Sequence, residues 1–188
     1  MSPRLTGGLV GAGHGLAVGI GAAVTLLHLS VAGRYGLHRD EAYFVECGRH
    51  LAAGYVDQPP VVPIIARVSA AIGGVTPFAL RVAPALAAGA TVVVVAAITR
   101  RLGGGRWAVL LAGLSAAACP VLLGAASLLN TVVFDQLWWA AAALVVIVLL
   151  STVVTPGCGW RSGQSLALVS RPRTPWSCGP SPWRSELC

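Results

Sequence analysis

Uncharged apolar runs alternate with short charged segments along the 188 residues. A helix needs about 20 apolar residues to cross the hydrocarbon core of a bilayer. Residues 9–32 form a run of 24 without a charge, and residues 82–99 form a run of 18 between two arginines. As one helix, residues 107–154 would measure about 72 Å, more than twice the thickness of that core. We therefore predict a turn at the polar cluster 127–131.

The predicted spans are residues 9–32, 81–100, 107–127 and 131–153. These four spans make the expected fold class all-α, a polytopic integral membrane protein. Residues 30–32, Ser-Val-Ala, resemble a signal-peptidase site. The apolar run before them exceeds the roughly 7–15 residues of a signal peptide, so we favour an uncleaved first span.

Arginine positions predict the orientation of the spans. The short loop 100–106 carries three arginines and no acid, and Arg4 precedes the first span. By the positive-inside rule both lie in the cytoplasm. An even number of spans returns the chain to the same side, so residues 33–80 and the turn at 127–131 face outward. The outer segment has four arginines of its own, which weakens this asymmetry.

Within the outer segment, residues 40–53 have the pattern of a short helix lying at the membrane interface. We expect Gly54 to end this helix, because glycine is the common residue after a helix C-terminus. Residues 57–60, Asp-Gln-Pro-Pro, must be extended, since prolines restrict the residues before them. Residues 61–72 are apolar but too short to cross, so we expect them to lie along the membrane or to re-enter it.

Composition supports a membrane protein. The chain is 56% hydrophobic and 10% charged, whereas soluble domains carry about 25% charged residues. All 13 basic residues are arginine, which indicates a GC-rich, bacterial coding sequence. The net charge of +7 would suit nucleic acid in a soluble protein. Here the arginines separate apolar spans, so we interpret them as topogenic and expect no nucleic-acid partner.

The five cysteines form no CxxC pair, and the four histidines have no spacing typical of a metal site. We therefore expect neither a zinc site nor a disulfide framework. Residues 155–188 change to Pro, Gly, Ser, Trp, Arg and Cys without a helical period. We divide the chain into a transmembrane part, 1–154, and an irregular tail, 155–188, and we interpret the tail as an out-of-frame translation.

Four of the six acidic residues fall within residues 35–60. Asp40 has the position of a helix N-cap, and Glu41 would favour the positive end of the helix dipole. Glu46 is spaced to pair with Arg49 or His50 on the helix surface. Asp135 lies about one turn inside the fourth span, where a carboxylate needs a wet cavity or a partner. By the predicted topology it lies on the same outer side as Asp40 and Glu41.

Three sequence blocks resemble the first outer loop of GT-C glycosyltransferases, closest to the protein-mannosyltransferase-like, family 39 and ArnT-like group. They are YGLHRDEAYF at 35–44, CGRHL at 47–51 and GYVDQPP at 54–60, and TVVFD at 131–135 resembles a later acidic element. The resemblance covers about residues 5–153. It implies a multi-pass protein of the bacterial plasma membrane, with the acidic loop outside, that takes a sugar from a polyprenyl-phosphate carrier.

The resemblance also implies roles for single residues. Asp40 becomes the candidate base, and Glu41 would orient it or help to bind Mg²⁺ or Mn²⁺. Positive charge for the leaving phosphate would come from an arginine or that metal ion. The candidate substrate-binding residues are Arg39, Arg49, Asp57, Gln58 and Asp135. Arg67 and Arg81 lie on the same side, and the sequence does not select among the arginines.

Members of this group have many more spans, so we interpret the chain as an N-terminal fragment that is inactive alone. Two alternatives stay open. One is a small transporter or channel subunit in which Asp135 lines an ion path. The other is a truncated, non-catalytic membrane protein.

Overall fold

The computed structural model describes residues 5–153, and describes side chains for residues 15–151. This part of the chain contains seven α-helices and no strand, which confirms the all-α prediction. In chain order they are α1 (Leu5–Val31), α2 (Arg39–Arg49), α3 (Val61–Gly73), α4 (Pro77–Arg101), α5 (Arg106–Ala117), α6 (Pro120–Ala126) and α7 (Thr131–Val153). The predicted tail, 155–188, and Arg4 lie outside the described residues.

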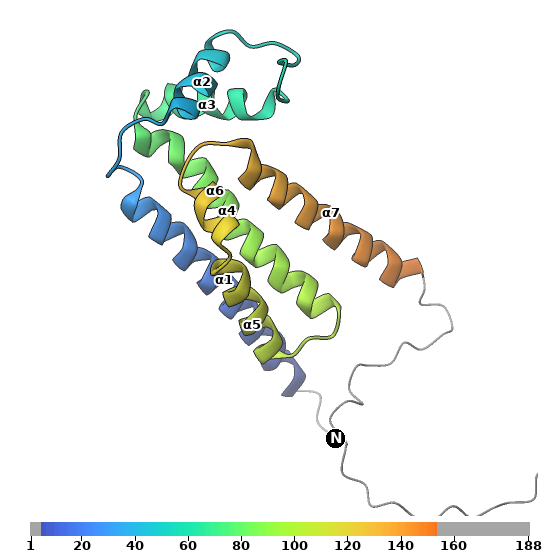
Figure 1. The fold of residues 1–188 in the computed structure, drawn as a ribbon. Coiled ribbons are helices and arrows are strands. Elements are labelled where there is room, and N and C mark those ends of the chain that lie inside the picture. The colour runs from blue at the N-terminus through green and yellow to red at the C-terminus, as the bar shows by residue number, and fades with distance from the viewer. Residues whose placement is uncertain (1–4, 154–188) are drawn as a thin grey trace, which may run out of the picture. The chain divides into compact units, whose positions relative to one another are not determined.

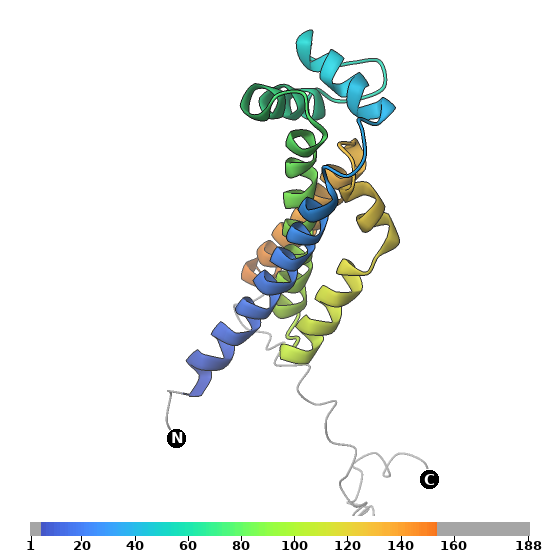
Figure 2. The ribbon, with the colours of Figure 1, turned by 90° about the vertical axis from the view of Figure 1, so that its left-hand side faces the viewer.

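Helix α4 is the centre of the bundle, because α1, α5, α6 and α7 all pack against it (Figures 1 and 2). The main hydrophobic core joins α1, α4, α6 and α7, and most of its members are small. Its buried residues are Val24, Ala87, Ala88, Val92, Leu122, Ala125, Ala126 and Val133. Small side chains let helices approach closely, which is typical of helix packing within membranes.

Helices α1 and α4 approach each other closely at Gly21 and Gly89. A Cβ added at Gly89 would lie 2.6 Å from the Gly21 carbonyl oxygen, and one added at Gly21 would lie 2.7 Å from the Gly89 carbonyl oxygen. The Thr25 hydroxyl also donates to the Ala85 carbonyl oxygen at 3.2 Å. Both glycines are therefore required by the spacing of the two backbones.

Helices α4 and α7 are long and apolar enough to cross a membrane, which agrees with the spans predicted at 81–100 and 131–153. The described side chains of α1, Gly15–Val31, form an apolar helix. The span predicted at 107–127 is not one continuous helix, although the two helices that form it are together apolar and long enough to count as one broken span. It consists of α5 and α6, which are bent by 57° at a break that ends at Pro120. Proline lacks the N–H that would continue the hydrogen-bond ladder, which accounts for the break.

Helices α2 and α3 lie at one end of the bundle, where α3 runs across the ends of the longer helices (Figure 1). Helix α3 buries Val62 and Ala66 in a cluster shared with α2 and α4, while Ile64 and Val68 are exposed. The predicted short apolar segment at 61–72 is therefore a helix outside the set of long spans.

The predicted bounds of α2 need two corrections. The N-cap is His38 instead of Asp40: the His38 Nδ1 accepts from the Asp40 N–H at 3.3 Å. The helix ends at Arg49, before the predicted end at Gly54. The reason is the Tyr55 hydroxyl, which donates to the Cys47 carbonyl oxygen at 2.7 Å and accepts from the Ala52 N–H at 3.3 Å. These contacts replace the bonds of a further helical turn.

Candidate functional site

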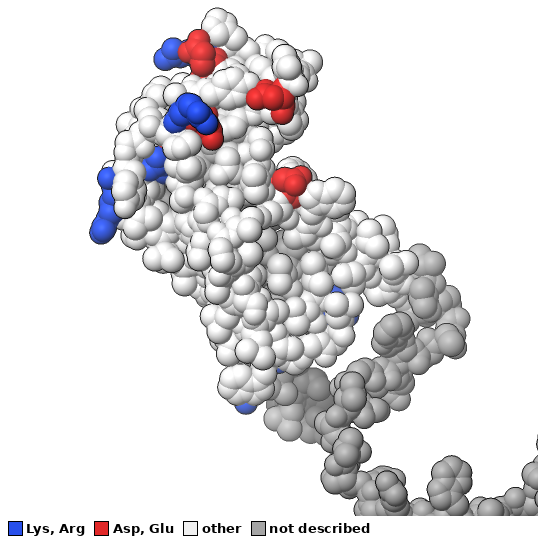
Figure 3. All heavy atoms as spheres, viewed as in Figure 1, with Lys and Arg blue, Asp and Glu red and all other residues white. Residues whose placement is uncertain are grey.

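The acidic side chains gather at the end of the bundle that carries α2 and α3 (Figure 3). Five acidic residues fall within the described part. They are Asp40, Glu41 and Glu46 on α2, Asp57 in the α2–α3 loop and Asp135 near the start of α7. The surroundings of these carboxylates differ sharply, from the fully buried Glu41 to the half-exposed Asp40.

Glu41 is fully buried and makes a bidentate ion pair with Arg81 of α4. Arg81 Nε donates to Glu41 Oε1 and Arg81 Nη2 donates to Glu41 Oε2, both at 2.8 Å. The Leu129 N–H donates to Oε1 at 3.3 Å, and the His38 N–H donates to Oε2 at 2.9 Å. Each carboxylate oxygen thus accepts two hydrogen bonds, and Glu41 joins α2, α4 and the α6–α7 loop.

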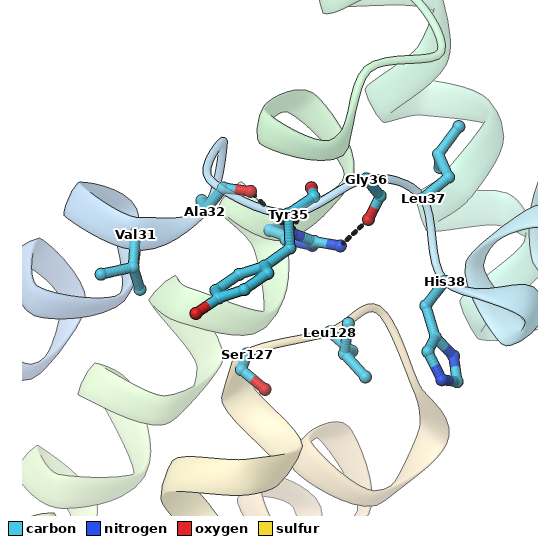
Figure 4. A pocket seen from close by; sticks show the side chains of 9 residues that line it. Val31, Ala32, Tyr35, Gly36, Leu37, His38, Ser127 and Leu128 are labelled. Atoms are coloured by element: carbon cyan, nitrogen blue, oxygen red, sulfur yellow. Dashed lines mark hydrogen bonds between the residues drawn. The ribbon is translucent and has the colours of Figure 1, made fainter.

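The other Arg81 donors hold the linker between α1 and α2 (Figure 4). Arg81 Nη1 donates to the Ala32 and Tyr35 carbonyl oxygens at 2.7 and 3.2 Å, and Nη2 donates to the Gly36 carbonyl oxygen at 2.8 Å. A guanidinium has five N–H groups, and all five of Arg81 have a protein acceptor. Arg81 therefore has no donor left for a substrate phosphate.

The charge on Glu41 is stabilised by its partners. Burial alone would raise the pKa of the Glu41 carboxyl, because a low-dielectric surrounding disfavours the charged form. The Arg81 guanidinium and the N–H groups of His38 and Leu129 outweigh burial, so the pKa lies below its ordinary value. Glu41 is therefore an ionised residue of the framework.

Asp40 is the neighbour of Glu41 in sequence but has a different environment. Its side chain is about half exposed, with Oδ1 3.5 Å from Arg39 Nε and Oδ2 3.7 Å from His38 Nδ1. His38 lines a cavity of about 430 Å³ between the α1–α2 linker and the end of α6 (Figure 4). We call it the linker cavity; its lining residues are Val31, Ala32, Tyr35, Gly36, Leu37, His38, Arg81, Ser127 and Leu128. Asp40 is thus an accessible carboxylate next to a residue of this cavity.

Three of the predicted substrate-binding residues line a second cavity, of about 360 Å³. We call it the acidic cavity. Asp57 and Gln58 reach it from the α2–α3 loop, and Asp135 reaches it from α7. Its other lining residues are Pro59, Val61, Val62, Thr131, Val132, Phe134 and Trp138. Residues 78 positions apart in the sequence therefore share one cavity, and Asp40 and Glu41 do not line it.

Asp57 is held from outside the acidic cavity by Tyr43. The Tyr43 hydroxyl donates to Asp57 Oδ1 at 2.7 Å. This bond raises the pKa of Tyr43 far above its ordinary value, because the carboxylate stabilises the protonated phenol. Tyr43 therefore stays a donor throughout the physiological pH range.

The predicted arginines differ in what they already bind. Arg39 is highly exposed and lies 3.5 Å from Asp40. Arg49 donates to Glu46 Oε2 at 3.0 Å, which is the predicted surface pair. Arg67 donates to the Gly48 carbonyl oxygen at 3.3 Å. Arg39 and Arg49 both have exposed side chains with N–H groups that face solvent, whereas Arg81 is fully occupied.

The predicted metal pair does not fit a divalent ion in this geometry. Both oxygens of Glu41 already accept two hydrogen bonds, so only Asp40 can offer an oxygen ligand. Within residues 15–151, no three His, Cys, Asp or Glu side chains converge as metal ligands would. Metal binding by Asp40 and Glu41 together is therefore not supported by the contacts of Glu41.

Sequence reasoning missed several of these partners. The His-x-x-Glu spacing of His38 and Glu41 is a local signal for a capping box that was available in the sequence. No local signal links Glu41 to Arg81, which is 40 residues away. Likewise, nothing in the spacing of Trp138 distinguishes it from the adjacent Trp139, although only Trp138 lines the acidic cavity.

Comparison with known proteins gives one family. The family model described as dolichyl-phosphate-mannose-protein mannosyltransferase matches residues 57–157. The match includes Asp57, Gln58 and Asp135, and begins after Asp40 and Glu41. No curated protein and no solved structure matches the chain. Because the family match covers more than half of the 188 residues, the chain belongs to the dolichyl-phosphate-mannose-protein mannosyltransferase family.

Proposed function

We propose that this chain is the N-terminal part of a membrane glycosyltransferase that moves a sugar from a polyprenyl-phosphate donor to an acceptor hydroxyl. The family match over residues 57–157 is the observation that carries this proposal. The gathering of the described acidic side chains at one end of an apolar bundle supports it (Figure 3). A lipid-linked sugar would meet the carboxylates at that end, where the bilayer meets water.

Asp40 is the base of the proposed reaction, because it combines an exposed carboxylate with a position beside a cavity. It accepts the proton of the acceptor hydroxyl while that oxygen attacks the anomeric carbon of the sugar. The bond between the anomeric carbon and the phosphate oxygen breaks, and polyprenyl phosphate leaves with the bonding electron pair. Arg39 and Arg49 are the candidate cations for this leaving group, since Arg81 is occupied by Glu41 and the linker.

The acidic end faces outward in this proposal. Arg100, Arg101 and Arg106 lie at the α4–α5 turn, at the opposite end of α4 from Arg81. By the positive-inside rule that turn lies in the cytoplasm. The carboxylates of α2 and the two cavities then face the outer side of a bacterial plasma membrane, where the acceptor would be glycosylated.

The test is donor turnover by the 188-residue chain in nanodiscs, which first decides whether the fragment is inactive alone, as its sequence predicts; the Asp40 assignment is then tested on the turnover that the parent chain shows. The chain is incubated with mannosyl-phosphoryl-polyprenol and a serine- and threonine-containing peptide, and release of polyprenyl phosphate is measured. Asp40→Asn should lower the rate at least about a hundredfold, the usual contribution of a general base. Glu46→Gln, which removes another exposed carboxylate of the same helix, should keep it. Unchanged turnover in Asp40→Asn would refute the base assignment, and no turnover by the parent chain would favour a non-catalytic fragment.

A further inference from the structure

The α4–α5 turn is rich in arginine and lies at the far end of α4 from the acidic side chains (Figure 3). Residues 100–107 include three arginines and no acid. Arg101 and Arg106 are exposed, and neither forms an ion pair with a carboxylate among the described side chains. At the other end of the bundle, the exposed Arg39 and Arg49 each lie beside a carboxylate. The turn therefore presents two guanidinium groups whose charge no described acid compensates.

The backbone of the turn is well fixed. The Gly104 N–H donates to the Thr99 carbonyl oxygen at 2.9 Å. Gly103 has a φ of 90°, a conformation that glycine adopts without steric cost. One helical turn into α5, Val109 is buried in a small cluster with residues of α1 and α4. The two arginines thus lie on either side of a short connection that is anchored to the bundle.

Arg106 lies where its charge does not stabilise its own helix. It is the first residue of α5, and a cation is unfavourable at the positive end of a helix dipole. Its guanidinium carbon lies 5.2 Å from the centre of the Trp107 ring, which is a cation–π distance. This contact orients the guanidinium beside a ring that is 65% exposed. The arrangement favours an anion outside the described helices as the partner of Arg106.

Exposed apolar side chains lie next to these arginines. Leu102 is 69% exposed in the turn, and the Trp107 ring is exposed at the start of α5. Tryptophan is enriched at the membrane–water interface, where its ring contacts both headgroups and acyl chains. Guanidinium groups match phosphate oxygens with two parallel N–H groups. The chemistry of the turn therefore fits an amphiphile with a phosphate head and an acyl tail.

We propose that the α4–α5 turn binds an anionic phospholipid, with Arg101 and Arg106 on the headgroup phosphate and with Leu102 and Trp107 against the acyl chains. The positive-inside rule places the turn in the cytoplasm, where the leaflet carries a negative surface potential. A zwitterionic phospholipid binds more weakly, because its own ammonium group competes with the arginines for the phosphate. A purely topogenic role would require positive charge during insertion but no lipid selectivity afterwards.

The test measures the affinity of the full chain for two lipids. The purified chain is titrated in detergent with phosphatidylglycerol or with phosphatidylcholine of the same acyl chains, and native mass spectrometry counts the lipids retained. We expect the parent to prefer phosphatidylglycerol. The double variant Arg101→Gln with Arg106→Gln should bind phosphatidylglycerol about thirtyfold more weakly, since each arginine near an anionic surface contributes about fivefold. Its affinity for phosphatidylcholine should change much less.

The chain offers two matched controls. Arg39→Gln with Arg49→Gln removes the same number of exposed charges at the other end of the bundle. Because each of those arginines already lies beside a carboxylate, this variant should change the affinity for phosphatidylglycerol by no more than about threefold. Arg101→Lys with Arg106→Lys keeps both charges of the turn, and it should retain most of the affinity. The other arginines of the chain are the same in each comparison.

The outcomes separate a lipid site from its alternatives. A parent that shows no preference for phosphatidylglycerol would overturn the inference, as would a glutamine variant of the turn that binds like the parent. A lysine variant as weak as the glutamine variant would overturn it too, because charge would not be the cause of binding. Inorganic phosphate should not displace phosphatidylglycerol, since it has no acyl chain to contact Leu102 and Trp107; displacement would overturn the assignment to a lipid. None of these outcomes depends on transferase activity.

Discussion

The ion pair between Glu41 and Arg81 should be a main determinant of the stability of the acidic end. The perturbation is Glu41→Gln, which keeps the size of the side chain. In glutamine an NH₂ group replaces one of the two carboxylate oxygens. At the Oε1 position this NH₂ group would face two donors, Arg81 Nε and the Leu129 N–H. At the Oε2 position it would face Arg81 Nη2 and the His38 N–H. The substitution also leaves the Arg81 charge buried, with a side-chain exposure of 4%.

The expected cost follows from that burial. Removing one partner of a buried ion pair destabilises a protein by about 3–5 kcal/mol. For a domain of this size each kcal/mol lowers the melting temperature by roughly 2–4 °C, so we expect a loss of roughly 10 °C. Glu46→Gln is the matched control, because the Glu46–Arg49 pair is exposed and such pairs contribute about 0–1 kcal/mol.

The assay is thermal unfolding of the chain in one detergent, followed by intrinsic fluorescence and by the accessibility of Cys47 to a thiol reagent. A double-mutant cycle with Arg81→Met completes it. The double variant should be destabilised by no more than either single variant, because neither charge is then left buried without its partner. A melting temperature for Glu41→Gln within 2 °C of the parent, or fully additive effects in the cycle, would refute this reasoning.

Gly89→Ala should destabilise the chain by about 1–3 kcal/mol in the same melting assay, because the new methyl group would overlap Thr25 and the Gly21 carbonyl on α1. Gly19→Ala is the control on α1. A Cβ added at Gly19 lies in open space, so this substitution should not destabilise the chain. Because the pKa of Glu41 is lower in the folded protein, its ionised carboxylate stabilises the fold at pH values above the ordinary glutamate pKa of 4.5. This contribution is lost as the pH falls through the lowered pKa of the folded state. The parent should therefore lose an increment of stability on acidification that Glu41→Gln lacks, and parallel pH-melting curves for the two proteins would contradict this.

Runs of uncharged residues predict helices α4 and α7 well, because crossing a bilayer demands a minimum apolar length whatever the tertiary packing. The turn at 127–131 was predictable for the same reason. A search for uncharged runs could not detect the break between α5 and α6, because residues 107–134 are all uncharged. Pro120 was the available signal, since a proline inside an apolar run interrupts the hydrogen-bond ladder.

The candidate site was predictable only at the level of its location. Topology placed the carboxylates of the first loop and Asp135 on one side of the membrane, but it does not say which of them share a cavity. That depends on how the α2–α3 loop folds over the start of α7, which brings Asp57 and Gln58 beside Asp135. The role of Glu41 depends on an arginine 40 residues away, and no local pattern encodes that pairing.

The contacts divide the five described acidic residues into two groups. Glu41 is saturated by Arg81 and two N–H groups, and Glu46 is paired with Arg49 on the surface. Asp40, Asp57 and Asp135 each keep at least one carboxylate oxygen that accepts no hydrogen bond from another residue of the described part of the chain. In the adjacent pair Asp40 and Glu41, Glu41 helps to fix the α1–α2 linker through Arg81, whereas Asp40 stays accessible to solvent. If the transferase proposal is correct, substitutions at Glu41 should lower activity and stability together, whereas those at Asp40 should lower activity alone.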